Sequence, residues 1–245
     1  MTMAAGMAKQ GMTPVFAVYS TFLQRGFDML LHDVALQGLH VVLAVDRAGL
    51  VGADGPTHHG CQDVGYLTQI PGMTVLCPAC YGELREMLRT ALSMDGPVAV
   101  RYPRGTEGRQ YPDWHGESAS VLRQGRDATL VSYGVMTDEL LSAADTLSER
   151  GFEAEVIKLH RIAPLDPEPV LDSVRRTGRL LVLEDCNENG SIGQQLAAAL
   201  AQAGVKAEQT LLLNLKQSFA PQGTVAQLRR LMGIDAEAVV HAFSL

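Results

Sequence analysis

The stretch VVLAVDR, residues 41–47, indicates how this chain folds. It is an unbroken apolar run, rich in valine, that ends abruptly at Asp46 and Arg47. A short continuous run of this kind is typical of a strand that is buried on both faces. Apolar residues at helical spacing separate it from similar runs, so we predict a parallel sheet covered by helices on both faces. The similar runs are Pro14–Val18, Met73–Leu76 and Val98–Val100.

The same alternation returns in the second half of the chain. Strands are predicted at Thr129–Tyr133, Ala154–Lys158, Leu180–Leu183 and Thr210–Leu213, and helices at 137–149, 167–176, 192–203, 223–232 and Ala236–Phe243. Between the halves, residues 105–126 are polar and rich in turn formers. We therefore predict an α/β protein of two three-layer domains with parallel or mixed sheets, residues 1–112 and 127–245, joined by a linker at 113–126.

Composition argues against several classes of function. The chain has 27 acidic and 20 basic residues and a net charge of −7, which is unlike a non-specific nucleic-acid binder. No apolar stretch reaches the roughly 18 residues that a membrane span needs. Four cysteines in 245 residues do not resemble a disulfide framework. We expect a cytoplasmic protein whose partners are neither nucleic acids nor membranes.

Polar side chains follow the predicted strands of the first half, at the points where those strands end. Ligands of open parallel sheets bind outside the carboxyl ends of the strands. Arginine's planar fork suits a phosphate group, so this edge predicts a site for a phosphorylated small molecule. The alternative for each arginine is a solvated position or a salt bridge to a carboxylate. The residues at this edge are Tyr19, Phe22, Arg25, Asp46, Arg47, Arg101 and Arg104.

The segment from Ala48 to Tyr66 is a long, glycine-rich loop that carries several titratable side chains. Loops of this length are often functional, and glycines permit a close backbone approach to a ligand. Asp54 and His58 are its candidate functional residues. A histidine here could act as a general acid or base, or donate a hydrogen bond to a substrate hydroxyl. The alternative is that His58 only satisfies buried backbone groups.

Two further motifs are interpreted as structural. Cys77 and Cys80 form a single C-x-x-C, which lacks the second pair of ligands that a zinc site needs. The turn Gly190–Gly193 precedes a predicted helix, where a phosphate can bind, but a plain helix start with Ser191 as N-cap is the simpler interpretation. We therefore expect no metal site within this sequence.

Four segments together resemble the 1-deoxy-D-xylulose-5-phosphate synthase family. They are PVFAVYSTFLQRGFD at 14–28, AVDRAGLVGADGPTH at 44–58, DGPVAVRYPRG at 95–105 and FAPQG at 219–223. The resemblance implies a thiamin-diphosphate-dependent transferase that condenses pyruvate with D-glyceraldehyde 3-phosphate, releases carbon dioxide and supplies isoprenoid and thiamin biosynthesis. It also implies that residues 1–112 are a partial pyrimidine-binding domain and residues 127–245 a transketolase C-terminal-type domain.

The resemblance assigns roles to five residues around the cofactor and the substrate. Phe22 would stack against the aminopyrimidine ring of thiamin diphosphate, and Arg25 would lie beside it. Tyr19, Asp54 and His58 would face the substrate pocket as catalytic residues. The cofactor carries the carbanion chemistry, whereas the protein positions and polarises the reacting groups.

Two arginines complete the implied site. Arg47 and Arg104 would bind the phosphate of glyceraldehyde 3-phosphate, which agrees with the phosphate site predicted from the sheet edge. The family's catalytic glutamate would fall just before residue 1, because Thr2 aligns with the end of its E-Q-H-A-V-T segment. The diphosphate-binding domain, which holds the magnesium ion, is also not represented.

We therefore expect this chain to act as the C-terminal part or subunit of such a synthase. We expect it to form a homodimer, to bind a separate chain that carries the diphosphate domain, or to do both. The alternatives are a truncated remnant without catalytic activity and a phosphate-binding partner module. A β-type subunit of a 2-oxo-acid dehydrogenase is a further alternative. The D-R-A-G and Y-P-R-G motifs favour the synthase family over it.

The expected absence of an edge strand from the first domain leads to a testable prediction. Unpaired backbone groups at a sheet edge favour association. The isolated chain should dimerise, bind a partner or be poorly stable, as measured by light scattering after gel filtration and by thermal melting. A stable, monodisperse monomer would contradict the prediction.

Overall fold

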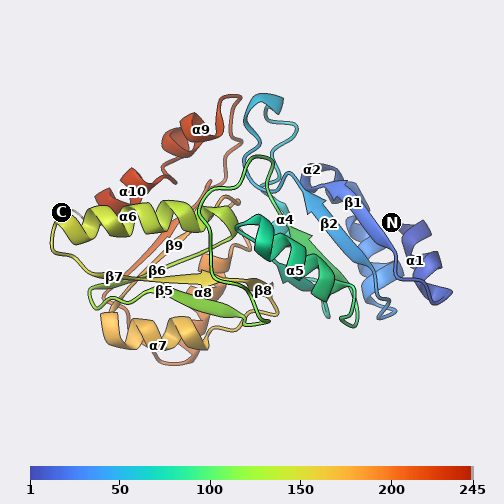
Figure 1. The fold of residues 1–245 in the computed structure, drawn as a ribbon, viewed down its shortest axis with the longest axis horizontal. Helices are drawn as coiled ribbons and strands as arrows, with labels where there is room; N and C mark the ends of the chain where they lie inside the picture. Colours follow the sequence, from blue (N-terminus) through green and yellow to red (C-terminus); the bar gives the residue numbers. More distant parts are fainter. Residues whose placement is uncertain (244–245) are drawn as a thin grey trace.

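The computed structural model describes residues 1–243 and contains two α/β units side by side (Figure 1). Within these residues the strands form two five-stranded sheets. Buried apolar clusters lie on both faces of each sheet, so each unit has three layers. The predicted α/β class with mixed sheets is confirmed. No helix in the described range is long and apolar enough to cross a membrane.

The first sheet is built around the valine-rich run. Its strands, in spatial order, are β1 (Val15–Tyr19), β2 (Val42–Asp46), β4 (Val98–Arg101), β3 (Thr74–Leu76) and β8 (Arg161–Ala163). The first four run parallel, whereas β8 is antiparallel to β3. Leu43 and Val45 contribute to one core cluster and Val42 to another, as expected for a strand buried on both faces.

Short helical segments surround this sheet. The α-helices are α1 (Thr2–Lys9), α2 (Ser20–Leu23), α3 (Phe27–Met29), α4 (Asp63–Leu67) and α5 (Tyr81–Ala91). Single 3-10 turns lie at Gln24–Gly26 and Gly52–Asp54, and a π-helical segment spans Leu30–Ala35. Helix α2 begins directly where β1 ends, so the side chains of Tyr19 and Phe22 are presented at the carboxyl edge of the sheet.

The second sheet follows the same plan. Its strands, in spatial order, are β10 (Gln209–Leu213), β9 (Arg179–Leu183), β6 (Ala128–Tyr133), β7 (Ala154–Leu159) and β5 (Ala119–Arg123). One face is covered by α6 (Thr137–Glu149), α9 (Val225–Met232) and α10 (Ala236–Ala242). The other is covered by α7 (Glu168–Thr177) and α8 (Ile192–Gln202).

Two strands depart from the sequence-based picture. β5 lies inside 113–126, the predicted linker, and pairs antiparallel with β7. β8 comes from the second half of the chain but extends the first sheet. Both lie at sheet edges, where burial is partial or the strand is short, so neither has a long apolar run to reveal it. The domain bounds 1–112 and 127–245 stay a prediction.

A buried arginine joins the two units. Arg101, at the end of β4, donates from Nε to Asp63 (2.9 Å) and from an Nη to Asp185 in the second unit (3.0 Å). Its guanidinium also lies 5.5 Å from the centre of the Tyr133 ring. Arg101 is only 5 % exposed, so it belongs to the interior and not to the ligand-binding edge where its place in sequence suggested it. The salt-bridge alternative is the correct one for this residue.

Replacement of Arg101 by methionine should destabilise the protein strongly. The change leaves the Asp63 and Asp185 carboxylates buried without their cation, and loss of one partner of a buried ion pair costs about 3–5 kcal/mol. Urea denaturation followed by circular dichroism measures the loss. Arg89→Met is the matched control, because Arg89 pairs with Glu86 on the surface and such pairs contribute about 1 kcal/mol or less. Equal effects of the two variants would contradict the assignment.

Candidate active site

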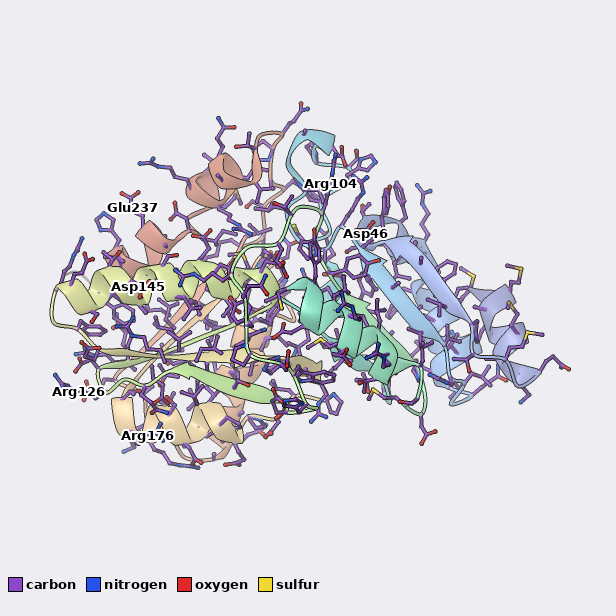
Figure 2. The ribbon with its side chains drawn as sticks, viewed as in Figure 1. Asp46, Arg104, Arg126, Asp145, Arg176 and Glu237 are labelled. Atoms are coloured by element: carbon purple, nitrogen blue, oxygen red, sulfur yellow. The ribbon has the colours of Figure 1, made fainter. Side chains whose placement is uncertain are left out.

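The carboxyl ends of the parallel strands bring the predicted site residues to one edge of the first sheet. Tyr19 ends β1, Asp46 ends β2, and Arg104 lies just beyond β4. Figure 2 shows Asp46 and Arg104 near each other at the upper edge of the molecule, between the two units. Both line a pocket of about 310 Å³. The sheet-edge argument therefore predicted this neighbourhood correctly.

Arg47 is held in an unusual backbone conformation at this edge. Its φ of 58° lies in the left-handed region, which costs a residue with a side chain about 1–3 kcal/mol. The Asp46 carboxylate accepts a hydrogen bond from the Arg47 backbone N–H at 2.7 Å and supports the turn. The guanidinium lies 4.1 Å from the centre of the Tyr19 ring and donates to the Tyr19 hydroxyl at 3.0 Å. A strained arginine fixed in this way is typical of a functional site.

Asp54 contacts both Arg47 and Arg104, the two arginines predicted from the sequence to bind the substrate phosphate. Its Oδ2 atom accepts hydrogen bonds from Nη1 of Arg47 and from Nη1 of Arg104, the second at 2.7 Å. The hydrogen bond from Arg104 holds the pKa of the Asp54 carboxyl below its ordinary value, although partial burial opposes this. Asp54 is therefore ionised at neutral pH, between two cations.

An aromatic surface lies beside this cluster. The rings of Tyr19 and Phe22 are stacked with centroids 5.5 Å apart and planes inclined by 19°. The His58 ring meets Phe22 edge-on at 5.4 Å. Phe22 is 47 % exposed. Such a half-exposed ring offers a flat surface on which the ring of a ligand can stack.

The two histidines of the long loop play different roles. His58 bonds through Nδ1 to the Thr57 hydroxyl at 2.9 Å, and its Nε2 has no hydrogen-bond partner within residues 1–243. His59 is buried: its Nδ1 accepts from the Val51 N–H at 3.1 Å and its Nε2 bonds the Pro221 carbonyl at 3.0 Å. The alternative of a histidine that satisfies backbone groups thus applies to His59, whereas His58 keeps a free ring nitrogen near the arginines.

The second unit supports this loop. Gln222 donates to the Ala53 carbonyl at 2.8 Å, next to Asp54. A Cβ on Gly52 would stand 3.1 Å from the Gly223 carbonyl oxygen, so a side chain there would crowd the contact. Sequence reasoning missed these supporting residues, although the FAPQG segment at 219–223 was among the motifs that it noted.

Arg25 is the one predicted site residue that the structure leaves apart. It is exposed and makes no hydrogen bond or ion pair within residues 1–243. A cleft of about 820 Å³ between the units is lined by its neighbour Gln24 and by Thr21. Further lining residues come from the loop and from the second unit: Thr57, His59, Gln62, Asn187, Asn189, Gln217 and Phe219.

The motifs interpreted as structural are largely buried. All four cysteines are unpaired and buried, and burial raises the pKa of the Cys77 thiol to about 12. At the Gly190–Gly193 turn, the Glu184 carboxylate accepts from the N–H groups of Ile192 and Gly193, both at 2.8 Å. Ser191 caps α8, as predicted. The helix start is therefore occupied by a protein carboxylate, which confirms the simpler interpretation.

Comparison with family models matches both halves of the chain. Residues 1–108 match the transketolase pyrimidine binding domain, and residues 117–239 match the transketolase C-terminal domain. The second match begins close to β5 and includes it, which agrees with the place of that strand in the second sheet.

Several curated relatives are named 1-deoxy-D-xylulose-5-phosphate synthase. The chain is 44% identical to 1-deoxy-D-xylulose-5-phosphate synthase 1 of Geobacter sulfurreducens, over 98% of this chain and 39% of the relative. It is also 44% identical to 1-deoxy-D-xylulose-5-phosphate synthase of Thermomicrobium roseum, over 97% of this chain and 39% of the relative. The chain thus spans about two fifths of the length of these relatives.

Solved structures show the same architecture. A split-gene transketolase, described as an inactive beta4 tetramer, superposes with a TM-score of 0.88 at 27% identity, over 99% of this chain and 78% of that one. Transketolase of Campylobacter jejuni superposes with a TM-score of 0.77 at 18% identity, over 98% of this chain and 37% of that one, a likeness of fold alone. The chain belongs to the transketolase family, with its pyrimidine-binding and C-terminal domains, and is similar to 1-deoxy-D-xylulose-5-phosphate synthases over almost all its length.

Proposed function

We propose that this chain is the C-terminal part or a subunit of a 1-deoxy-D-xylulose-5-phosphate synthase. The reaction would join pyruvate to D-glyceraldehyde 3-phosphate, with loss of carbon dioxide, and would supply isoprenoid and thiamin precursors. The observation that carries the proposal is the cluster of Arg47, Arg104 and Asp54 beside the exposed ring of Phe22. It combines a phosphate-binding pair with a surface for a cofactor ring, in a chain similar to such synthases.

The residues present fit part of a thiamin diphosphate site. Phe22 offers a half-exposed ring, packed against Tyr19 on one side and His58 on another, where an aminopyrimidine ring could stack. Arg25 would lie beside that ring. Thiamin diphosphate, when bound, supplies the carbanion chemistry. No cluster of three or more His, Cys, Asp or Glu side chains within residues 1–243 could hold a metal ion. We propose that a partner chain or further domain would hold magnesium and the diphosphate.

The chain's own residues would position the acceptor substrate. Arg47 and Arg104 would form charge-assisted hydrogen bonds to the phosphate of glyceraldehyde 3-phosphate. The free Nε2 of His58 would donate a hydrogen bond or a proton to the acceptor's oxygen near the Phe22 ring. Tyr19 would hold Arg47 in place through its hydroxyl and its ring face. Asp54 would set the spacing of the two arginines.

A partner is part of the proposal. We propose that the active assembly is a cytoplasmic homodimer, or includes a chain with the diphosphate domain. The second candidate function is a non-catalytic module that keeps only the phosphate site. The likeness to a split-gene transketolase described as an inactive tetramer favours testing this chain with and without such a partner.

Synthase activity should depend on a second component. We expect no turnover from the chain alone when it is given pyruvate, glyceraldehyde 3-phosphate, thiamin diphosphate and magnesium. Addition of the product of the neighbouring upstream gene should restore it, with product followed by a coupled reductase or by mass spectrometry. Activity of the isolated chain would contradict the need for a partner. Inactivity of both mixtures would favour the non-catalytic module.

Loss of Arg104 should weaken use of the phosphorylated substrate. In the assembled enzyme, Arg104→Ala should raise KM for glyceraldehyde 3-phosphate by about 10–100-fold, since a hydrogen bond to a charged group contributes about 1.5–3 kcal/mol. KM for pyruvate should change little. Arg109→Ala is the control, because that exposed arginine bonds Ser142 and Asp145 away from the site. An unchanged KM for glyceraldehyde 3-phosphate would remove Arg104 from the phosphate site.

A further inference from the structure

A single carboxylate oxygen contacts both arginines of the proposed phosphate site. Oδ2 of Asp54 accepts from Arg47 and from Arg104, and its Oδ1 has no hydrogen-bond partner within residues 1–243. The two arginines follow separate strands and both carry a positive charge. Their guanidinium groups would repel each other without an anion between them. Asp54 therefore occupies the position in which a ligand's anionic oxygen would sit.

The arginines also keep unused donors. The Nε atom of Arg47 is buried and has no hydrogen-bond partner within residues 1–243. Arg104 is about half exposed, with 48% of its side chain accessible, and within residues 1–243 it bonds only Asp54. One carboxylate oxygen thus leaves much of the donor capacity unmet. A phosphate, with three strong acceptor oxygens and a charge near −2, matches it better.

The geometry of the loop confines any movement of Asp54 to a short segment. Gly52 and Gly55 flank it with φ values of 71° and 77°, conformations that glycine adopts without strain. Behind it, Gln222 holds the Ala53 carbonyl and His59 bonds the Pro221 carbonyl. The base of the loop is therefore anchored to the second unit, whereas the Asp54 side chain is 27% exposed and can rotate toward solvent.

We propose that Asp54 is an internal competitor for the phosphate site: its carboxylate occupies Arg47 and Arg104 in the free protein and yields them to the phosphate monoester of the substrate. This inference rests on the proposed function, which supplies the phosphate ligand. The intramolecular contact keeps the two arginines at a fixed spacing between turnovers. It also lowers the apparent affinity for every solute anion, because only the fraction of molecules with Asp54 displaced can bind.

Asp54→Asn tests the competition directly. We would titrate inorganic phosphate into the full chain by isothermal calorimetry and compare the wild type, Asp54→Asn and Asp113→Asn. The asparagine keeps the size of the side chain but cannot hold two cations. Affinity for phosphate should rise by about tenfold or more, within the usual range for coupled binding. Asp54→Ser, checked by circular dichroism, gives the same measurement if Asp54→Asn does not fold.

Asp113→Asn is the matched control for net charge. Asp113 is exposed, makes no hydrogen bond or ion pair within residues 1–243 and is not part of the candidate site. The affinity of this variant for phosphate should stay within about twofold of the wild type, since solvent screens the interactions of exposed charges.

The outcomes separate this inference from the proposed function. Tighter binding by Asp54→Asn, with Asp113→Asn near the wild type, supports the competitor. Equal or weaker binding by Asp54→Asn overturns it, because Asp54 would then only arrange the arginines for the ligand. Equal gains in both variants overturn it too, because overall charge would be the cause. Absence of phosphate binding in every protein overturns the phosphate site itself, and the competitor with it.

Discussion

The placement of Arg101 between Asp63 and Asp185 is the constraint on which the rest of the molecule depends. An arginine can remain charged in the interior only when carboxylates surround it, and here one comes from each unit. The bridge stands at the end of β4, three residues before Arg104. The same segment therefore fixes the orientation of the units and places a cation at the edge of the sheet. Gln222 and His59 add a second attachment, so the loop that carries Asp54 and His58 is held from both units.

Much of the scaffold could be predicted from the sequence because its strands are buried. Each of the predicted strands is present with ends within one residue of the expected ones, since continuous valine and leucine runs have few other ways to avoid water. β5 and β8 were not predicted, because they lack such continuous apolar runs. Their residues are only partly apolar or few, and their pairing depends on neighbours distant in the chain. Local pattern carries no information about such contacts.

The candidate site was likewise predictable only in part. Position after a strand end correctly brought Tyr19, Arg47 and Arg104 to one edge. Position alone could not distinguish Arg104, which reaches the surface, from Arg101, which turns inward, because both follow the same strand. Nor could it show that one oxygen of Asp54 meets two guanidinium groups, which requires the three-dimensional path of the loop. The residue types at the site could thus be predicted from the sequence, whereas the side chains with which they form hydrogen bonds and ion pairs could not.

The place of β8 has a consequence for how such proteins evolve. Arg161–Ala163 belongs to the second half of the chain, yet it closes the first sheet beside β3. Recombination that replaces the second half with that of a distant relative therefore also replaces a strand of the first half. The incoming strand must match the bulge at Val75 and Leu76, or the sheet is left with an open edge. The two halves therefore depend on each other for a complete first sheet, and a chimera of halves from distant relatives should be less stable than either parent.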